Sequence, residues 1–236
     1  MLVSEVFDSV QGEGPNLGRP STFLRLGGCN LGCVWCDAAY TWRFSDRHKH
    51  IDPTIYDPKD QLTKMGVNEV YKKITDFDIN HYVITGGEPL LQRMELESLV
   101  ALLLNNRYVT IEFETAGTLR PLQTHDPRIS YIVSPKLENS GNDFEDRYKI
   151  PVLKEFANRD DANFKFVISN EEDLKETDRM VWDFHIKPER VWIMPEGTTI
   201  GAISEKSAKF VRDIITRRYN LTTRLQIIAY GNKRGT

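Results

Sequence analysis

Cysteine is scarce in this chain, and its absence from most of the sequence is informative. The 236 residues contain three cysteines, and all three lie between positions 29 and 36. An odd number of thiols, gathered in one place, does not suit the disulfide framework of a secreted protein. The sequence also opens without a charged-then-apolar leader, so we expect a protein of the reducing cytoplasm.

Long apolar runs and an excess of one charge are missing as well. The longest apolar run, residues 99–104, is far too short to span a bilayer. The formal net charge is -3, and lysine and arginine are spread along the chain rather than gathered in blocks. We therefore expect neither a membrane protein nor a general nucleic-acid-binding surface.

The pattern along the chain predicts an α/β fold. A hydrophobic content of 40% over this length can form one large core, so we expect a single domain covering residues 1–236. Short β-rich runs alternate with helical patterns, which is typical of a mainly parallel sheet. The expected strands are residues 4–10, 22–26, 81–85, 109–114, 129–134, 164–169, 191–195 and 225–229; several read as continuous apolar runs covered on both faces.

The helices are expected between these strands, where apolar residues recur at i, i+3 and i+4. They are residues 68–77, 93–106, 171–184 and 205–219, and Asn170 and Ser204 are the expected N-caps of the last two. Six or seven strand–helix units favour a β/α barrel or an incomplete one. Residues 44–63 and 137–151 interrupt the rhythm and are either solvated loops or lids and inserts beside the site.

The three cysteines form the motif Cys29-x3-Cys33-x2-Cys36. Thiolates gathered on one short loop favour soft metals and iron–sulfur clusters. Three thiolates would leave one iron of a 4Fe-4S cluster without a protein ligand. Such an open coordination position distinguishes a reactive metal site from a structural one.

Two simpler interpretations of the cysteines stay open. A lone cysteine is often a small buried hydrophobe, although three at this spacing fit that description poorly. A structural zinc site would need a fourth ligand, and only His48 or His50 could reach the loop. The other histidines, His81, His125 and His185, form no ligand pattern with it.

A second motif, Gly86-Gly87-Glu88-Pro89, follows an expected strand. Paired glycines let the backbone approach a ligand closely, and Glu88 supplies a negative group that suits an ammonium. On its own this run is ordinary turn sequence. Beside the cysteine loop we expect it to bind the amine of an amino acid that chelates the open iron, because the amine hydrogens still need hydrogen-bond partners.

Together the two motifs resemble the radical S-adenosylmethionine (SAM) superfamily. The resemblance implies a partial β/α barrel of the radical SAM type and a 4Fe-4S cluster held by the three cysteines. It also implies that SAM binds the open iron and is cleaved by reduction to a 5′-deoxyadenosyl radical. An external reductant, such as flavodoxin or ferredoxin, would supply the electron.

Further segments resemble one family of that superfamily, the 7-carboxy-7-deazaguanine synthases, from end to end. The family resemblance implies a lyase of 7-deazapurine (queuosine-type) biosynthesis. It would convert 6-carboxy-5,6,7,8-tetrahydropterin to 7-carboxy-7-deazaguanine with loss of ammonia, and it would form a homodimer. The segments are residues 7–14 (FDSVQGEG), 23–28 (FLRLGG), 35–37 (WCD), 114–118 (ETAGT), 134–136 (SPK), 194–197 (MPEG) and 230–236 (YGNKRGT).

The same resemblance assigns the site residues, with no catalytic side chain beyond the cluster and SAM. A pterin offers paired N–H donors for carboxylate or amide acceptors. Its own carboxylate would pair with a cation, for which Arg25 is the candidate. Arg25 could instead be a structural ion-pair partner of Glu13 or Glu114. The substrate set is Val10, Gln11, Gly12, Glu13, Arg25, Thr85, Glu114 and Thr236, and the SAM set is Gly86, Gly87, Glu88, Ser134, Pro135, Lys136, Met194, Pro195 and Glu196.

Two positions depart from the family pattern. Ala38 stands where the family has a threonine or serine whose hydroxyl helps to hold Mg2+, and a methyl group cannot ligate a cation. Either substrate, water and Asp37 or Thr41 hold the ion, or the enzyme works without it. Gln226 stands where a histidine is frequent, so a proton-transfer role there is in doubt.

Two other functions remain as alternatives. A radical SAM activase that makes a glycyl radical on a partner protein needs the same cluster but an open groove for a polypeptide. A zinc-stabilised binding module would be colourless, whereas an iron–sulfur protein is brown.

Overall fold

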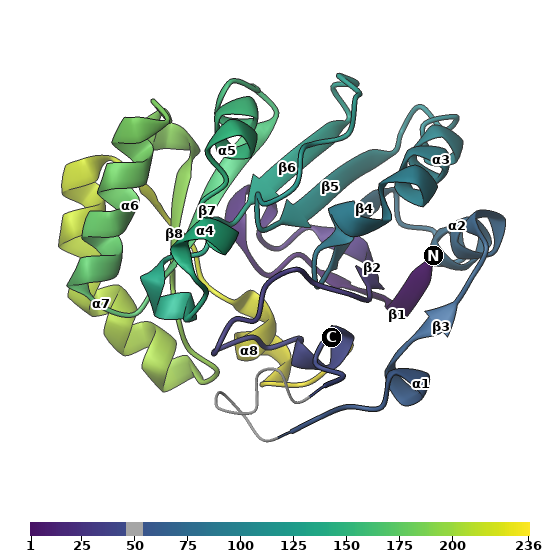
Figure 1. Ribbon diagram of the computed structural model, residues 1–236, viewed down its shortest axis with the longest axis horizontal. Helices are drawn as coiled ribbons and strands as arrows, with labels where there is room; N and C mark the ends of the chain where they lie inside the picture. Colours follow the sequence, from purple (N-terminus) through teal and green to yellow (C-terminus); the bar gives the residue numbers. More distant parts are fainter. Residues whose placement is uncertain (46–53) are drawn as a thin grey trace.

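One nine-stranded sheet organises the computed structural model, which describes residues 1–45 and 54–236 (Figure 1). The strand order is β3-β1-β2-β4-β5-β6-β7-β8-β9; β1 runs antiparallel to its two neighbours, and every other neighbouring pair is parallel. Within the described ranges the edge strands β3 and β9 do not pair, so the sheet stays open, as an incomplete barrel requires. The strands are β1 Leu2–Val10, β2 Pro20–Leu26, β3 Thr63–Lys64, β4 His81–Gly86, β5 Thr110–Thr115, β6 Ile129–Val133, β7 Ala162–Ile168, β8 Val191–Pro195 and β9 Asn220–Leu221.

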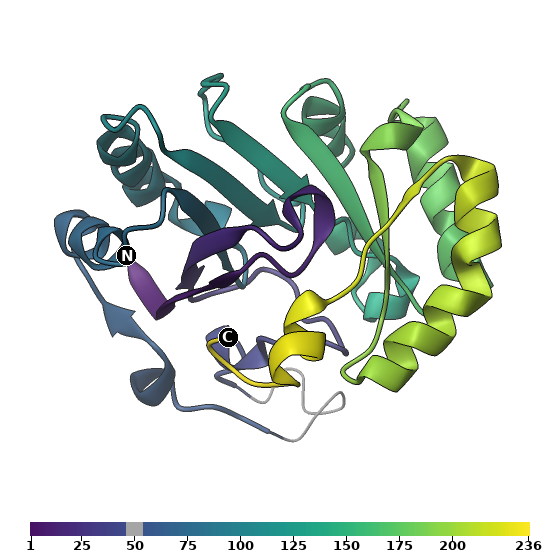
Figure 2. The same cartoon turned by 180° about the vertical axis from the view of Figure 1, so that it is seen from behind.

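Helices cover the outer face of this sheet. Figures 1 and 2 show α2, α3, α5, α6 and α7 arranged around the outside, whereas α8 lies on the opposite side, near the C-terminus. No helix in the part of the chain that the structure describes is both long and apolar enough to cross a membrane. The helices are α1 Pro58–Gln61, α2 Val67–Thr75, α3 Arg93–Leu103, α4 Phe144–Arg147, α5 Ile150–Ala157, α6 Glu171–Asp183, α7 Ile200–Arg217 and α8 Leu225–Tyr230.

The two faces of the sheet carry different side chains. In β7, Phe164, Phe166 and Ile168 join the main core beneath the helices, whereas the alternate residues Lys165 and Val167 line a cavity on the other face. This alternation follows from the two-residue period of a strand. The expected strands are buried on both faces, as β4 and β7 show, and the face toward the cavity also carries polar side chains such as Lys165 and Glu114.

The expected strand at residues 225–229 is also wrong, because this segment forms helix α8. A short apolar run cannot be assigned by periodicity alone. In the structure Ile227 is buried together with Arg224, three residues earlier, while the neighbouring Ile228 is half exposed. This i, i+3 pattern belongs to a helix, and the last strand of the sheet is β9 instead.

The helix boundaries differ from the expected ones mainly at α7. It begins at Ile200, where Thr199 is the N-cap and accepts a hydrogen bond from the Ala202 amide at 3.2 Å, so Ser204 lies inside the helix. Asn170 is the N-cap of α6, as expected. The expected insert at residues 44–63 lies partly outside the described residues; its later part forms α1 and the start of β3.

Candidate active site

The cysteine loop follows the C-terminal end of β2. Cys29, Cys33 and Cys36 carry free thiols, and all three line one cavity of about 350 Å³. Burial raises the pKa of Cys29 to about 12 and that of Cys36 to about 11. Without a metal the thiols of Cys29 and Cys36 stay protonated at neutral pH, and a bound metal is what makes such groups thiolates.

Hydrogen-bond donors surround the sulfur atoms. The Trp42 indole N–H donates to Cys36 Sγ at 3.3 Å, the Asn142 side-chain amide donates to Cys33 Sγ at 3.2 Å, and the Leu31 amide lies 3.4 Å from Cys29 Sγ. Donors to sulfur stabilise the thiolate form and tune the potential of an iron–sulfur cluster. The loop therefore suits the cluster that its motif predicts.

The expected insert at residues 137–151 braces this loop. The Val34 amide donates to the Ser140 carbonyl at 3.0 Å, and the Trp35 indole donates to the Asn139 carbonyl at 3.0 Å. The Gly32 amide donates to Asn142 Oδ1 at 2.7 Å. An insert beside the site was one of the two expectations for this segment, but its contacts with the cysteine loop were not predictable, because more than a hundred residues separate the two segments along the chain.

The paired glycines bring the end of β4 against the cysteine loop. Gly86 has φ +146°, and a side chain there would overlap the backbone of Leu26. A side chain at Gly87 would overlap the carbonyl of Gly28, and the Glu88 amide donates to that carbonyl at 2.8 Å. Only glycine permits this approach.

Glu88 itself is fully buried beneath the turn. Its carboxylate accepts hydrogen bonds from Thr115 Oγ1 at 2.8 Å, the Ala116 amide at 2.8 Å and the Leu90 amide at 3.1 Å. The carboxylate thus ties β4 to β5. Glu88, Pro135 and Pro195 lie behind the cavity wall, whereas the other predicted site residues line the cavity.

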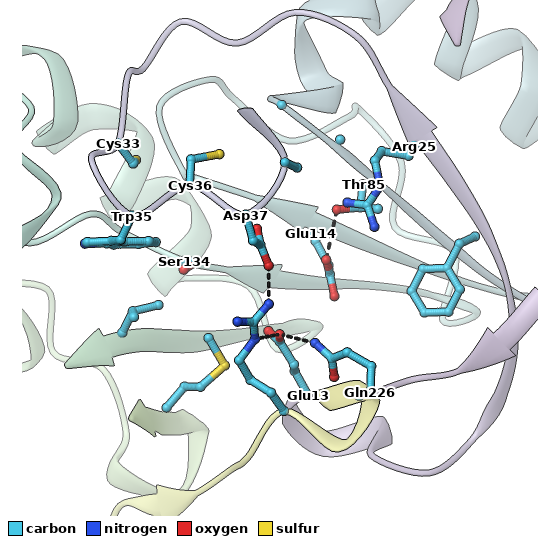
Figure 3. Close-up of a pocket in the computed structure, with 18 of the residues that line it drawn as sticks. Glu13, Arg25, Cys33, Trp35, Cys36, Asp37, Thr85, Glu114, Ser134 and Gln226 are labelled. Carbon is cyan, nitrogen blue, oxygen red and sulfur yellow. Dashed lines mark hydrogen bonds and ion pairs between the residues drawn. The ribbon is translucent and has the colours of Figure 1, made fainter. Parts of the chain in front are cut away.

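Glu13 is the centre of a charged network on the cavity floor (Figure 3). It forms an ion pair with Lys165, lies 3.4 Å from Arg224 Nε, and accepts a hydrogen bond from Gln226 at 2.9 Å. Burial would raise the pKa of Glu13, but the charges of Lys165 and Arg224 outweigh it and lower this pKa to about 2. Glu13 is therefore an anion at every working pH.

A second acidic pair lies beside it. Gln11 donates to both Glu112 and Glu114, and Thr85 Oγ1 donates to Glu114 Oε2 at 2.9 Å. Burial, followed by repulsion from Glu114, raises the pKa of Glu112 to about 7. Glu114 lines the cavity while Glu112 lies beneath it, so Glu114 is the acceptor that a ligand meets.

Arg25 lies on the wall next to Thr85. Its Nε donates to Glu5 Oε2 at 2.9 Å, and the Tyr40 hydroxyl donates to the same oxygen at 2.8 Å. The structural partner of Arg25 is thus Glu5 rather than Glu13 or Glu114. Its two Nη atoms make no hydrogen bond to any described residue, so they remain available to a ligand carboxylate.

The opposite wall holds the expected SAM residues. Lys136 Nζ donates to Ser134 Oγ at 3.0 Å and lies 5.5 Å from the centre of the Trp35 ring. Met194 and Glu196 line the same side of the cavity. An aromatic ring, a thioether and polar side chains together suit a nucleoside carrying an amino acid.

The C-terminal segment closes the remaining side. Residues 232–236, with Thr236 among them, line the cavity. Arg234 Nε donates to Glu5 Oε1 at 2.5 Å, and its guanidinium lies 3.8 Å from the centre of the Tyr40 ring. The segment that the resemblance assigns to substrate binding is thus fastened beside Arg25.

The residues near Ala38 do not form a magnesium site. Asp37 is paired with Arg224, and the Thr41 hydroxyl is fully buried and donates to the Ala38 carbonyl at 2.7 Å. Across residues 1–45 and 54–236, no group of three His, Asp or Glu side chains is arranged to hold a metal ion. A hard divalent cation prefers several oxygen ligands, and the described residues around Ala38 offer it one shared carboxylate.

Several residues of the site were not predicted from the sequence, among them Glu5, Tyr40, Lys165 and Arg224. Lys165 had a usable signal, because a charged residue between Phe164 and Phe166 breaks an apolar strand in the same way as Arg25 does. Arg224 had none, since its segment was assigned to the wrong kind of element.

The chain matches known proteins over its whole length. Residues 24–129 match the radical SAM superfamily. A 7-carboxy-7-deazaguanine synthase of Pyrobaculum aerophilum is 36% identical over 99% of this chain and 96% of its own length. The synthase of Hyperthermus butylicus is 33% identical over 97% of this chain and 92% of its own length.

Solved structures agree with this result. The crystal structure of QueE from Escherichia coli matches with a TM-score of 0.70 and 27% identity, over 94% of this chain and 92% of that chain. Streptococcus suis SuiB bound to S-adenosylmethionine has a TM-score of 0.53 at 16% identity, over 86% of this chain and 53% of its own, and shows the fold alone. The site and these matches lead to one conclusion: this chain belongs to the 7-carboxy-7-deazaguanine synthase family of the radical SAM superfamily.

Proposed function

We propose that this chain is a lyase that converts 6-carboxy-5,6,7,8-tetrahydropterin to 7-carboxy-7-deazaguanine with loss of ammonia. One observation carries the proposal: the three thiols, the carboxylates of Glu13 and Glu114, and the cation Arg25 all line a single cavity. The names of the relatives support the same reaction.

The cysteine loop and the wall opposite Arg25 would hold the cofactors. Cys29, Cys33 and Cys36 would bind a 4Fe-4S cluster, and the residues around Gly87, Ser134 and Lys136 would hold SAM beside it. Bound there, the two cofactors supply a 5′-deoxyadenosyl radical. The close approach of Gly87 to Gly28 and Cys29 supports this arrangement.

The floor residues would orient the pterin. Glu114 offers carboxylate oxygens to paired N–H donors of the ring, and Glu13 is a permanent anion for the same purpose. The two Nη groups of Arg25 match the two oxygens of the substrate carboxylate, and Glu5 fixes the guanidinium from behind. The C-terminal segment excludes water from this side.

We also propose that the protein is a cytoplasmic homodimer. A small electron donor of the flavodoxin or ferredoxin kind would reduce its cluster. Residues 137–151 act as a brace for the cysteine loop, and residues 44–63, which lie partly outside the described ranges, remain an expected insert. A cavity of about 350 Å³ suits a compact ring better than the polypeptide of an activase.

The test is anaerobic turnover of 6-carboxy-5,6,7,8-tetrahydropterin with reconstituted protein, SAM and a strong reductant. We expect 7-carboxy-7-deazaguanine, identified by mass, together with released ammonia. The Cys33→Ala variant should make none, because the cluster loses one of its three ligands. A colourless protein with stoichiometric zinc would support the binding-module alternative, and a glycyl radical on an added partner would support an activase.

A further inference from the structure

Arg224 joins three parts of the active site. Its Nη2 pairs with Asp37 Oδ2 in the cysteine loop, its Nε lies 3.4 Å from Glu13 Oε1 on the floor, and its Nη1 donates to the Gly197 carbonyl at 2.9 Å. The side chain is 9% exposed and lines the cavity. A guanidinium is therefore fixed between the cluster loop and the substrate floor.

The place beside Asp37 is also where the resemblance expects a magnesium ion. Ala38 supplies no oxygen there, and the Thr41 hydroxyl is already bonded to the Ala38 carbonyl. Asp37 is the one nearby carboxylate on this loop, and its charge is neutralised by Arg224. A divalent ion would have to displace the guanidinium or lie beside it against its repulsion.

The geometry points to Arg224 as the built-in cation of this site, which takes the electrostatic role of the divalent ion and makes turnover independent of Mg2+. This inference rests on the proposed function for its substrate, a ring that carries a carboxylate. The guanidinium offers a fixed positive charge, one unit rather than the two of Mg2+, without the cost of removing water from a strongly hydrated ion. It also holds Asp37 and Glu13 in place before substrate binds.

The ion pairs with Asp37 and Glu13 keep the Arg224 guanidinium charged. Burial alone would lower the pKa of Arg224, but Asp37 and Glu13 raise it. Asp37 remains 52% exposed, so one side of its carboxylate faces the cavity. A single carboxylate of that kind binds Mg2+ weakly, because the ion needs several ligands in octahedral geometry.

The first test uses the reconstituted wild-type protein in buffers freed of divalent ions with a chelating resin. We expect product formation to change less than about twofold when millimolar MgCl2 is added. Electron paramagnetic resonance of Mn2+, with the cluster oxidised and substrate present, should show only the free ion. A tenfold loss of turnover that Mg2+ restores, or stoichiometric Mn2+ binding, would overturn the inference.

The second test uses variants. Arg224→Met should raise KM at least about tenfold, while Arg224→Lys should retain part of the affinity. Arg217→Met is the matched control, because Arg217 pairs with Asp178 and Asp213 on the outer helices and should leave KM unchanged. A KM unchanged in Arg224→Met would contradict the inference.

A gain-of-function variant separates charge from packing. The double variant Ala38→Thr with Arg224→Met restores a hydroxyl and removes the guanidinium, so we expect its turnover to rise with added Mg2+. If the turnover of a folded double variant does not respond to Mg2+, then Arg224 and Mg2+ do not play the same electrostatic role. If the Arg224→Met substitution prevents folding, the Mn2+ measurement on the wild type still decides.

The two proposals fail in different ways. Absence of product with and without Mg2+ would reject the proposed reaction, and the Mn2+ titration would still test whether a divalent ion binds. Product formed only with Mg2+ would confirm the reaction and reject the role of Arg224.

Discussion

Asn142 connects the cysteine loop to the segment that braces it. Its Oδ1 accepts from the Gly32 amide at 2.7 Å while its Nδ2 donates to Cys33 Sγ at 3.2 Å. A donor to a cluster sulfur withdraws electron density and raises the reduction potential. One side chain therefore positions the loop and adjusts the electronic state of the site.

The Asn142→Ala substitution should lower the potential of the reconstituted cluster by an amount on the order of tens of millivolts, because the sulfur loses its donor. A redox titration followed by electron paramagnetic resonance measures this shift. The control is Asn158→Ala, at the end of α5 and remote from the loop, which should leave the potential unchanged. Equal potentials in both variants would show that the Asn142 contact does not influence the cluster.

Gly87 sets the distance between the β4 turn and the cysteine loop. In Gly87→Ala the new methyl group would overlap the Gly28 carbonyl and lie 2.8 Å from Cys29 Cβ, so the loop must move. We expect iron incorporation during reconstitution to fall well below the wild-type level. Gly201→Ala, on α7 with open space around it, should bind iron normally; normal iron content in Gly87→Ala would contradict the steric argument.

At the residue scale, the sequence predicted the features that depend only on residues close together along the chain. The cysteine spacing and the glycine pair are informative because they act within a few residues of each other. Glu88 was predicted to bind a ligand; its buried carboxylate accepts hydrogen bonds from Thr115 and the Ala116 amide, contacts that the sequence did not predict. Partners such as Glu5 for Arg25 depend on strand register, which no local pattern specifies.

At the element scale, helix starts can be tested directly. Asn170 Oδ1 accepts from the Asp173 amide at 3.1 Å, and Asp173 Oδ2 accepts from the Asn170 amide at 3.1 Å, which completes a capping box at the start of α6. Asn170→Ala should reduce the free energy of unfolding by about 1 kcal/mol, measured by chemical denaturation. Ser204→Ala lies within α7 and should have little effect; a loss of equal size there would restore Ser204 as a cap.

His81 begins β4 with its side chain buried. Burial, and then the charge of Arg19, lowers the pKa of His81 from 6.5 to about 4. The unfolded chain therefore binds more protons than the folded one between these values, so stability is lost as pH falls from 6.5 to 4, by up to about 3 kcal/mol. His81→Phe should flatten this part of the stability profile, whereas the exposed His125→Gln should keep it; an unchanged slope in His81→Phe would refute the assignment.

The elements show where sequence periodicity succeeds. Strands with apolar residues toward the helices were found, because packing against α3, α6 and α7 imposes the period on both partners. The segment that became α8 was misassigned, since it is a short and almost continuous apolar run in which no period can be recognised. Ligand-facing polar residues such as Lys165 obey the strand period but are hidden from an analysis based on hydrophobicity alone.

At the scale of the whole molecule, the open sheet creates the site. A closed barrel fills its interior with side chains, whereas here β3 and β9 remain apart in the described chain and the inner face of the strands lines a cavity. Long-range ion pairs converge on that face: Glu13, which follows β1, pairs with Lys165 in β7 and with Arg224, which precedes α8. Their convergence follows from topology, so the sequence predicted the partial barrel but not the network inside it.

The C-terminal segment closes this opening through Arg234. The guanidinium donates to Glu5 Oε1 at 2.5 Å and to Gln61 Oε1 at 2.6 Å, and lies 3.8 Å from the centre of the Tyr40 ring. It thereby joins β1, α1 and the loop after the cysteines. Because Glu5 also holds Arg25, loosening Arg234 should disturb the substrate cation as well.

We therefore expect Arg234→Gln to raise KM for the pterin about tenfold with a smaller change in kcat, because the segment must be ordered again when substrate binds. Hydrogen exchange of residues 231–236 should become faster in the free protein and recover when substrate is present. Arg212→Gln, an exposed arginine on the outside of α7, is the control and should match the wild type in both measurements. Unchanged exchange together with unchanged KM would show that the segment is held without Arg234, and Glu5 would then act on Arg25 alone.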